Sequence, residues 1–168
     1  MEKTLHKDLY IKDEWFQKES SKIFQNEWFC VARNEDFEVP GDFKLLNIAG
    51  ESSFLLLGED KQIRSFFNLC KHRGCQLLDE TDESQSKGNF KKFIRCPYHS
   101  WTYNLDGSLR KAPHLDLNAN NNEYHLNQIM TQSWGGFLFI KMKNNGRSLA
   151  DQVNDFENQF HRYGLENL

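Results

Sequence analysis

The sequence has no long apolar run, no strong excess of either charge and few cysteines. Its 168 residues carry 21 lysines and arginines against 24 aspartates and glutamates, which gives a formal net charge of −3. This balance gives no basis for a nucleic-acid partner or for binding to an anionic membrane surface. No apolar stretch approaches the roughly 20 residues that a transmembrane helix needs. We therefore expect neither nucleic acid nor a membrane among the partners.

The N-terminus also lacks the features of a secretory signal peptide. The first residues, Met1–His6, contain no apolar core of the required length, and no small-residue cleavage site is present. This predicts a cytoplasmic protein. In that compartment four cysteines favour metal binding or catalysis over disulfide bonds.

Aromatic side chains, in contrast, are abundant. The chain has 14 phenylalanines and 4 tryptophans within a hydrophobic fraction of 38%. Such a composition is typical of a folded domain, and 168 residues are enough for one sizeable core. Because no internal repeat is visible, we expect residues 1–168 to form a single domain.

Helical patterns occur only near the two ends of the chain. The first predicted helix covers about residues 13–27, with Asp13 as its N-cap. The second covers about residues 148–163 and begins at Ser148 as a cap. Its apolar face has helical spacing and consists of Leu149, Val153, Phe156 and Phe160.

Short strands are predicted throughout the intervening region, about residues 28–143. Apolar or alternating runs occur at 28–32, 43–48, 54–57, 63–69, 93–95, 102–104, 108–112, 126–132 and 136–142. Polar residues 79–92 are expected to form an exposed excursion. The sum is a mainly β fold: a small antiparallel β sandwich with a hairpin subdomain, flanked by N- and C-terminal helices.

Two short motifs combine one cysteine with one histidine each. Cys70 and His72 form a C-x-H pair, whereas Cys96 and His99 form a C-x-x-H pair. Placing both side chains of a C-x-H pair on one tetrahedral ion is awkward, but sending them to two neighbouring irons is easier. A Rieske [2Fe–2S] cluster needs this donor set, because two cysteines bind one iron and two histidines bind the other. The sequence thus predicts transfer of single electrons.

The two neutral ligands have a consequence for the electron affinity of such a cluster. Two thiolates neutralise the oxidised core, whereas four thiolates would leave it negatively charged and harder to reduce. Histidine ligation therefore raises the reduction potential into the range of about −150 to +300 mV.

A zinc-stabilised binding module is the main alternative, because zinc takes the same ligand types. Zinc sites usually pair C-x2–4-C with H-x3–5-H, and the mixed pairs here fit that pattern poorly.

At these motifs the chain resembles the α subunits of Rieske non-haem iron oxygenases, which include ring-hydroxylating dioxygenases and choline-type enzymes. The matching segments are Cys70–Leu77, Cys96–Leu109 and Trp134–Ile140. The resemblance implies a Rieske-type fold in which Cys70 and Cys96 bind one iron and His72 and His99 bind the other. It also places Trp101 beneath the cluster. Apart from the resemblance, the Gly135-Gly136 pair indicates either close backbone approach under the cluster loops or a bulge.

Two positions differ from related patterns. Ser100 stands where the oxygenases often have glycine, and Cys75 stands where a small or apolar residue is common. The cytochrome bc branch joins its two cluster loops by a disulfide, which Tyr98 excludes here because it replaces the partner cysteine. Trp101 replaces a hydroxyl residue of that branch, which predicts a potential at the low end of the Rieske range. For Cys30 and Cys75 we expect burial rather than redox chemistry.

The related oxygenases activate O₂ at a second, mononuclear iron held by two histidines and a carboxylate. The sequence ends about where that domain is expected to begin. His114, Asp116 and His161 imitate such a triad, but solvated histidines are the better interpretation. We therefore expect a component of a Rieske-type oxidoreductase rather than a complete oxygenase.

The leading hypothesis is an electron relay from a reductase or ferredoxin to a mononuclear iron on another polypeptide or domain. The edge formed by His72 and His99 is its predicted docking surface. Because electrons cross between subunits in the related trimers, a homo-oligomer is a further expected partner. A free-standing Rieske ferredoxin and the zinc module remain the alternatives.

Overall fold

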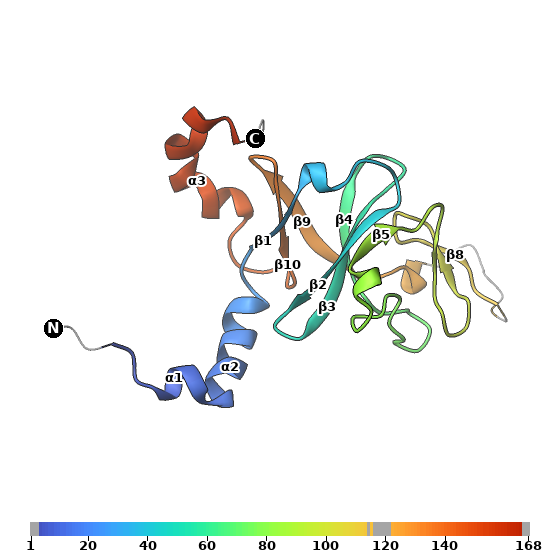
Figure 1. Ribbon diagram of the computed structural model, residues 1–168, viewed down its shortest axis with the longest axis horizontal. Coiled ribbons are helices and arrows are strands. Elements are labelled where there is room, and N and C mark those ends of the chain that lie inside the picture. Colours follow the sequence, from blue (N-terminus) through green and yellow to red (C-terminus); the bar gives the residue numbers. More distant parts are fainter. Residues whose placement is uncertain (1–3, 114, 116–121, 166–168) are drawn as a thin grey trace.

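The computed structural model describes residues 4–113, 115 and 122–165. A central β domain carries helices at one end and a small hairpin region at the other (Figure 1). Its strands are β1 (Phe29–Arg33), β2 (Asp42–Ile48), β3 (Glu51–Leu57), β4 (Ile63–Phe67), β5 (Lys87–Asn89), β6 (Ile94–Arg95), β7 (Thr102–Tyr103), β8 (Leu109–Lys111), β9 (Gln128–Trp134) and β10 (Phe137–Lys141). Its helical segments are α1 (Asp8–Ile11), α2 (Asp13–Glu19), the π-helical η1 (Ser20–Phe24), η2 (Asn34–Asp36), η3 (Glu83–Gln85), η4 (Asn122–Tyr124), α3 (Leu149–Phe160) and η5 (His161–Tyr163).

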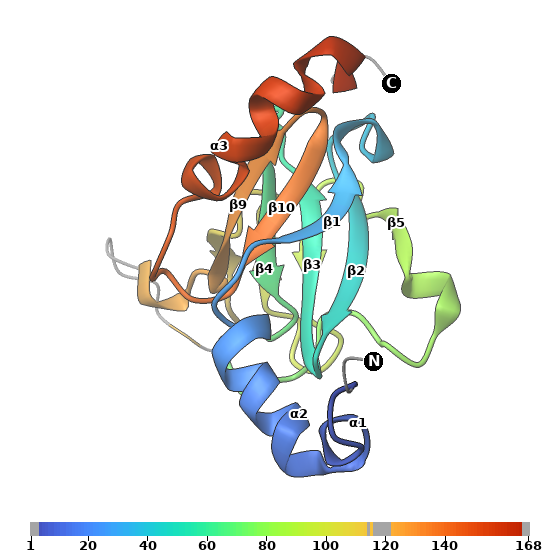
Figure 2. The same cartoon turned by 90° about the vertical axis from the view of Figure 1, so that its left-hand side faces the viewer.

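Two antiparallel sheets make up the β domain. The larger sheet has the strand order β1-β10-β9-β4-β3-β2-β5, and the smaller one has the order β6-β7-β8. Figure 2 shows the larger sheet face-on, with β1 crossing in front of it. The mainly β fold with a hairpin subdomain and flanking helices is confirmed, and every predicted strand has a counterpart within a few residues.

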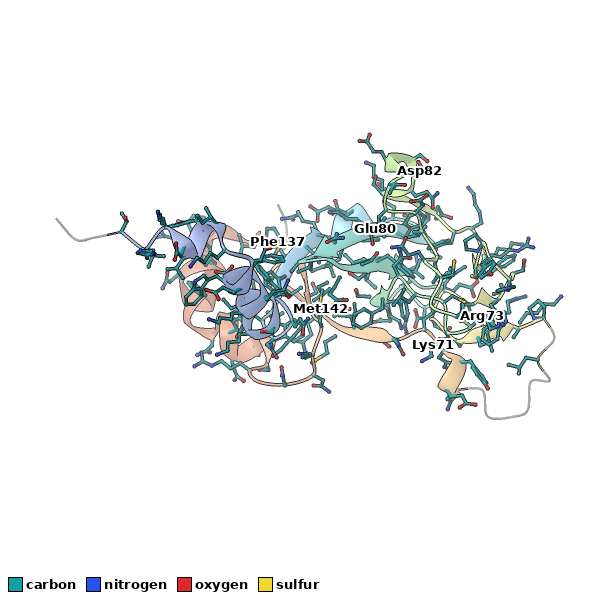
Figure 3. All side chains as sticks on the ribbon, turned by 90° about the horizontal axis from the view of Figure 1, so that it is seen from below. Lys71, Arg73, Glu80, Asp82, Phe137 and Met142 are labelled. Carbon is teal, nitrogen blue, oxygen red and sulfur yellow. The ribbon has the colours of Figure 1, made fainter. Side chains whose placement is uncertain are left out.

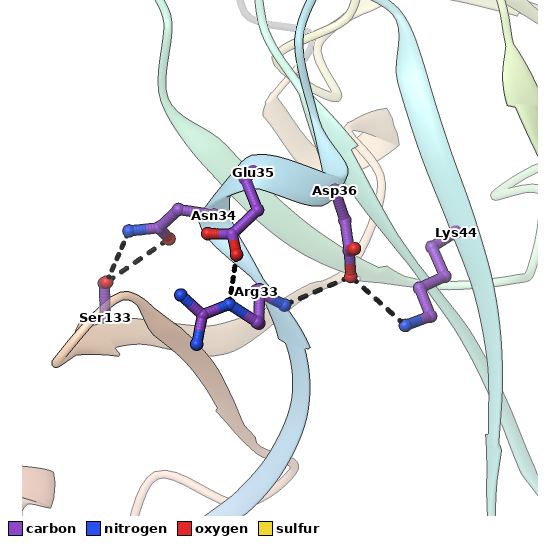
Figure 4. A network of polar contacts seen from close by, with 6 residues as sticks. All are labelled: Arg33, Asn34, Glu35, Asp36, Lys44 and Ser133. Atoms are coloured by element: carbon purple, nitrogen blue, oxygen red, sulfur yellow. Dashed lines mark hydrogen bonds and ion pairs between the residues drawn. The ribbon is translucent and has the colours of Figure 1, made fainter. Parts of the chain in front are cut away.

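The larger sheet curls until the strand at one end of its order approaches β2. Lys44 of β2 donates a hydrogen bond from Nζ to the Val31 carbonyl of β1 (3.2 Å) and lies 3.4 Å from Asp36 Oδ2. Asp36 in turn accepts from the Arg33 backbone N–H, while Glu35 pairs with the Arg33 side chain (Figure 4). These contacts occupy a carbonyl of the edge strand β1, which would otherwise be open to pairing.

Strand β3 is buried on both of its faces. Because side chains alternate along a strand, Phe54 and Leu56 point to one side and Leu55 and Leu57 to the other. Phe54 and Leu56 pack into the core shared with the hairpin region, whereas Leu55 and Leu57 pack against β9 and β10. The continuous apolar run in the sequence therefore forms the centre of the sandwich.

The N-terminal helix differs from its predicted form. Helix α2 begins at Asp13 and continues through η1 to Phe24, so it ends before residue 27. Lys12 occupies the N-cap position without a side-chain hydrogen bond, so the prediction that Asp13 is the cap is wrong. Asp13 instead lies in the first helical turn, where its negative charge interacts favourably with the positive end of the helix dipole. No helix in the described part of the chain is long and apolar enough to cross a membrane.

The C-terminal helix has the predicted cap but only half of the predicted buried face. Ser148 Oγ accepts from the Asp151 backbone N–H (3.1 Å) and donates to the Asp151 carboxylate (2.7 Å). Leu149 and Val153 are buried. Phe156 is 50% exposed, however, so only the first half of the predicted face, Leu149 and Val153, packs against Trp28.

Two loop predictions need correction. The polar excursion 79–92 contains the short strand β5, which pairs with β2 through Phe43↔Gly88. The sequence did not predict this strand because its residues are polar, and an edge strand needs little apolar burial. Gly135 and Gly136 lie neither under the loops nor at a bulge. Both have positive φ (56° and 80°) and form the two-residue turn between the paired residues Trp134 and Phe137.

Candidate metal centre

The two predicted motifs form loops with the same backbone closure. In the Cys70 loop (residues 70–75), the Cys70 N–H donates to the Cys75 carbonyl (2.8 Å) and the Gly74 N–H donates to the Cys70 carbonyl (2.9 Å). In the Cys96 loop (residues 96–101), the Cys96 N–H donates to the Trp101 carbonyl (2.8 Å), and the Ser100 N–H donates to the Cys96 carbonyl (3.1 Å). Each loop is thus closed by its own cysteine.

This closure requires a left-handed residue four positions after each cysteine. Gly74 has φ of 66° and Ser100 has φ of 60°. Glycine adopts this conformation freely, whereas a residue with a Cβ does so at a cost of about 1 kcal/mol. The geometry therefore explains why glycine suits position 100. Ser100 adopts the same left-handed conformation as Gly74, so the Cys96 loop closes in the same way despite the serine.

The two loops bring the thiols of Cys70 and Cys96 together in the core. Each residue is 2% exposed, and all four cysteines of the chain are free thiols. Burial raises the pKa of the Cys70 thiol, and the adjacent Cys96 contributes to the rise. Hydrogen bonds from Tyr103 and from the His72 backbone act in the opposite direction. The surroundings of Cys70 thus include donors suited to a metal-bound thiolate, which only accepts hydrogen bonds.

The imidazoles of His72 and His99 lie beside each other. Their ring centroids are 4.7 Å apart with an interplanar angle of 72°. Nδ1 of each ring is buried and has no hydrogen-bond partner among the described residues. Burial, together with nearby His99 and Arg73, lowers the pKa of His72 and so favours the neutral form that binds metals. Two adjacent unpaired nitrogens are what a two-histidine iron site requires.

The four side chains form two pairs rather than one shell. Within residues 4–113, 115 and 122–165, no three histidine, cysteine, aspartate or glutamate side chains gather as they would around one metal ion. The thiols form one pair and the imidazoles form the other. This division suits two irons bridged by sulfide, since each iron then takes one pair.

Comparison with protein families decides between the cluster and zinc. Residues 27–125 match the family model described as "Rieske [2Fe-2S] domain", which covers more than half of the chain. This chain belongs to the Rieske [2Fe–2S] domain family. Its cofactor is a [2Fe–2S] cluster, so the zinc-stabilised module is excluded.

Similar proteins place this Rieske domain among oxygenase subunits. The oxygenase subunit of carnitine monooxygenase from Acinetobacter baumannii is 34% identical over 156 residues, covering 91% of this chain and 40% of the relative. The oxygenase subunit of glycine betaine monooxygenase from Pseudomonas aeruginosa is 30% identical over 165 residues, covering 98% and 37%. The crystal structure of the quaternary ammonium Rieske monooxygenase CntA superposes with a TM-score of 0.84 at 32% identity, covering 95% and 45%.

The likeness extends along almost the whole chain, but the chain spans only about 40% of the length of these curated relatives. All three are monooxygenases or their subunits. The Rieske domain is therefore similar to oxygenase α subunits, as predicted, while the ring-hydroxylating dioxygenase activity suggested by the sequence resemblance stays a prediction.

Beneath the Cys70 loop lie two aromatic residues, Trp101 and Tyr103. The Trp101 ring stacks on the His72 ring at a centroid distance of 4.8 Å and an interplanar angle of 6°. The Tyr103 hydroxyl lies 3.1 Å from Cys70 Sγ and accepts a hydrogen bond from the Lys71 backbone N–H (3.1 Å). The position predicted for Trp101, beneath the cluster, is consistent with this stacking. Tyr103 was not identified from the sequence. Tyr103 lies two positions after Trp101, and this spacing, which places both side chains on one side of the chain, was the signal that could have identified it.

The remaining candidate residues have varied positions. Cys75 is half-buried, ends the Cys70 loop and packs against the core, with its thiol adjacent to that of Cys96. The predicted burial of Cys30 is wrong: it is exposed, because it lies on the edge strand β1 next to a β-bulge. His114 and Asp116 lie outside the described residues, as does the side chain of His161.

A cavity of about 480 Å³ opens beside the imidazoles. It is lined by Lys71, His72, Arg73, His99, Trp101, Pro113, Leu115 and Tyr124. Lys71 and Arg73 lie at the end of the molecule away from α1, α2 and α3, whereas Glu80 and Asp82 lie on the separate excursion (Figure 3). The edge of the Rieske domain beside the histidines is thus bordered by positive charge.

Proposed function

We propose that this Rieske domain is an electron relay whose cluster is held by Cys70 and Cys96 on one iron and by His72 and His99 on the other. One observation supports this ligand set above the rest: two adjacent buried Nδ1 atoms without partners lie on the same two loops as a buried pair of thiols. When bound, a cluster with these ligands accepts and releases single electrons at about −150 to +300 mV.

The protein's own residues provide the route for the electron. Each imidazole that binds through Nδ1 leaves its other nitrogen for contact with a partner or with solvent. His72 and His99 both line the open cavity, so we propose that this edge exchanges electrons with a reductase or ferredoxin and with an oxygenase centre.

The relatives support one class of oxygenase centre. Because they include oxygenase subunits of carnitine and glycine betaine monooxygenases, we propose a mononuclear iron centre acting on a quaternary ammonium compound, on another domain or another polypeptide. Association with further copies of the chain, and a cytoplasmic location, are part of the same proposal.

Cysteine variants test the ligand set, because the chain supplies matched controls. Protein is produced anaerobically and assayed for iron, labile sulfide and the reduced-state EPR signal. Cys70→Ser and Cys96→Ser are expected to lose all three. Cys30→Ser and Cys75→Ser are expected to retain them, since Cys30 is exposed and Cys75, although its thiol is adjacent to Cys96, is not one of the proposed ligands. Equal loss in Cys75→Ser would contradict the assignment.

A reoxidation assay tests the relay. Reduced protein is mixed with a carnitine monooxygenase oxygenase subunit whose own cluster cysteines have been replaced, in the presence of O₂ and carnitine. We expect reoxidation of the cluster to be faster with that subunit than without it. Equal rates would argue against an oxygenase partner and favour the free-standing carrier.

A further inference from the structure

The two imidazoles of the site have different neighbours. The His72 ring is stacked face to face on Trp101, which is 5% exposed. The His99 ring is covered by Tyr98, at a centroid distance of 3.7 Å and an angle of 38°, but Tyr98 is 62% exposed. One histidine is therefore held by a ring fixed in the core, and the other by a ring that is largely in solvent.

Trp101 is itself fixed by one backbone hydrogen bond and one aromatic neighbour. Its carbonyl accepts the hydrogen bond from the Cys96 N–H that closes the Cys96 loop. The Tyr124 ring meets it edge-on at 5.6 Å and 81°. A buried ring with one anchored backbone and one perpendicular aromatic neighbour has little freedom to turn, so the stacked imidazole has little freedom either.

The spacing of the two aromatic residues matches the spacing of the residues above them. Trp101 and Tyr103 are two positions apart on one side of the chain, and His72 and Cys70 are two positions apart in the loop. Trp101 contacts His72 and Tyr103 contacts Cys70. The Cys96 loop and β7 thus support both side chains of the Cys70 loop from below.

From this arrangement we infer that Trp101 is a positioning residue that fixes the ring plane of His72. The inference rests on the proposed ligand set, and it adds that the two histidines are held unequally. A ligand whose ring is fixed before assembly needs no ordering when the cluster binds, and contacts that orient a ligand in this way change metal affinity by about 10- to 100-fold.

The test compares Trp101→Leu, Trp101→Phe and Tyr98→Leu in cluster-loaded protein. Pulsed EPR of the reduced state measures the nitrogen couplings of the two imidazoles, and a chelator assay measures the rate of iron loss. Trp101→Leu is expected to alter one coupling and to speed iron loss by about tenfold or more. Trp101→Phe keeps a ring and should restore most of both properties. Tyr98→Leu should leave that coupling unchanged, because Tyr98 contacts His99 instead.

Each outcome separates this inference from the ligand assignment. If the unsubstituted protein binds no iron and sulfide, the proposed function fails. If it binds them and Trp101→Leu matches it in both assays, the positioning role is overturned while the proposed function stands. If Trp101→Leu does not fold, Tyr124→Leu replaces it, since Tyr124 supports Trp101 from outside the loops. Tyr124→Leu should shift the same coupling, and an unchanged coupling overturns the inference.

Discussion

The Tyr103 hydroxyl lies 3.1 Å from Cys70 Sγ, and the two residues are 33 positions apart in the chain. Tyr103 is fully buried, and its hydroxyl oxygen already accepts a hydrogen bond from the Lys71 N–H. Its own proton is therefore available to the sulfur. Burial and the adjacent Cys70 sulfur raise the pKa of Tyr103, so the hydroxyl stays protonated and acts as a donor.

Tyr103→Phe should lower the reduction potential of the cluster. A hydrogen bond to the sulfur stabilises the reduced state more than the oxidised state, because the reduced cluster carries more negative charge. A difference of about 1 kcal/mol corresponds to about 40 mV for a one-electron couple. Redox titration measures the shift, with Tyr98→Phe as the control because Tyr98 is exposed. This donor also opposes the low-end potential predicted from Trp101, which the same titration checks.

His99→Cys should lower the potential further. An added thiolate makes the oxidised centre more negative, so accepting an electron becomes less favourable, by on the order of 100 mV. His6→Cys is the matched control, because the His6 side chain is 72% exposed near the N-terminus. An unchanged potential in a His99→Cys protein that still contains iron and sulfide would contradict the proposed ligand.

Gly107→Ala should destabilise the fold by about 2–3 kcal/mol. Gly107 has φ of 84°, and a Cβ there would overlap the Phe66 ring in the core. Gly50→Ala is the matched control, since Gly50 has φ of 88° but a Cβ at that position would meet no other atom within 4 Å. The control should cost only about 1 kcal/mol. Urea denaturation of both variants measures the difference, and equal losses would show that contact with Phe66 is unimportant.

The Asp60–Arg64 ion pair should give the fold a pH-dependent contribution in acid. Hydrogen bonds from Arg64 lower the pKa of Asp60 to about 2, compared with about 3.9 for an unfolded aspartate. Since the folded pKa is the lower one, this stabilisation is present above about pH 4 and is lost as the pH falls towards 2. Its size is below about 1 kcal/mol, because the Asp60 side chain is 50% exposed.

Thermal melts at pH 2 to 6 measure that contribution. The Tm difference between the unsubstituted protein and Asp60→Asn should shrink as the pH falls below 4. Glu59→Gln is the control, because Glu59 is exposed in the same turn and forms none of the ion pairs found among the described residues. A Tm difference that stays constant with pH would rule out the ion pair as its source.

Much of the fold was predictable because the deciding signals are local. Alternating apolar residues mark β2 and β10, and the Ser148 cap marks the start of α3. Strand β5 was missed because its residues, Lys87–Asn89, are polar and pair only at an edge of the sheet. The exposure of Cys30 and of Phe156 could not be predicted either, since neither periodicity nor residue type tells which apolar positions a neighbouring element covers.

Residue order alone was enough to predict a donor set and to specify the cofactor class, because C-x-H and C-x-x-H spacings are local and chemically specific. Three relationships depended instead on how the folded chain packs: which cysteine faces Cys70, which imidazole is held by a buried ring, and that Tyr103 donates to the sulfur. Each of them joins segments that are far apart in the chain. Their geometry is set by how the two loops pack on β7, and no spacing within one motif contains that information.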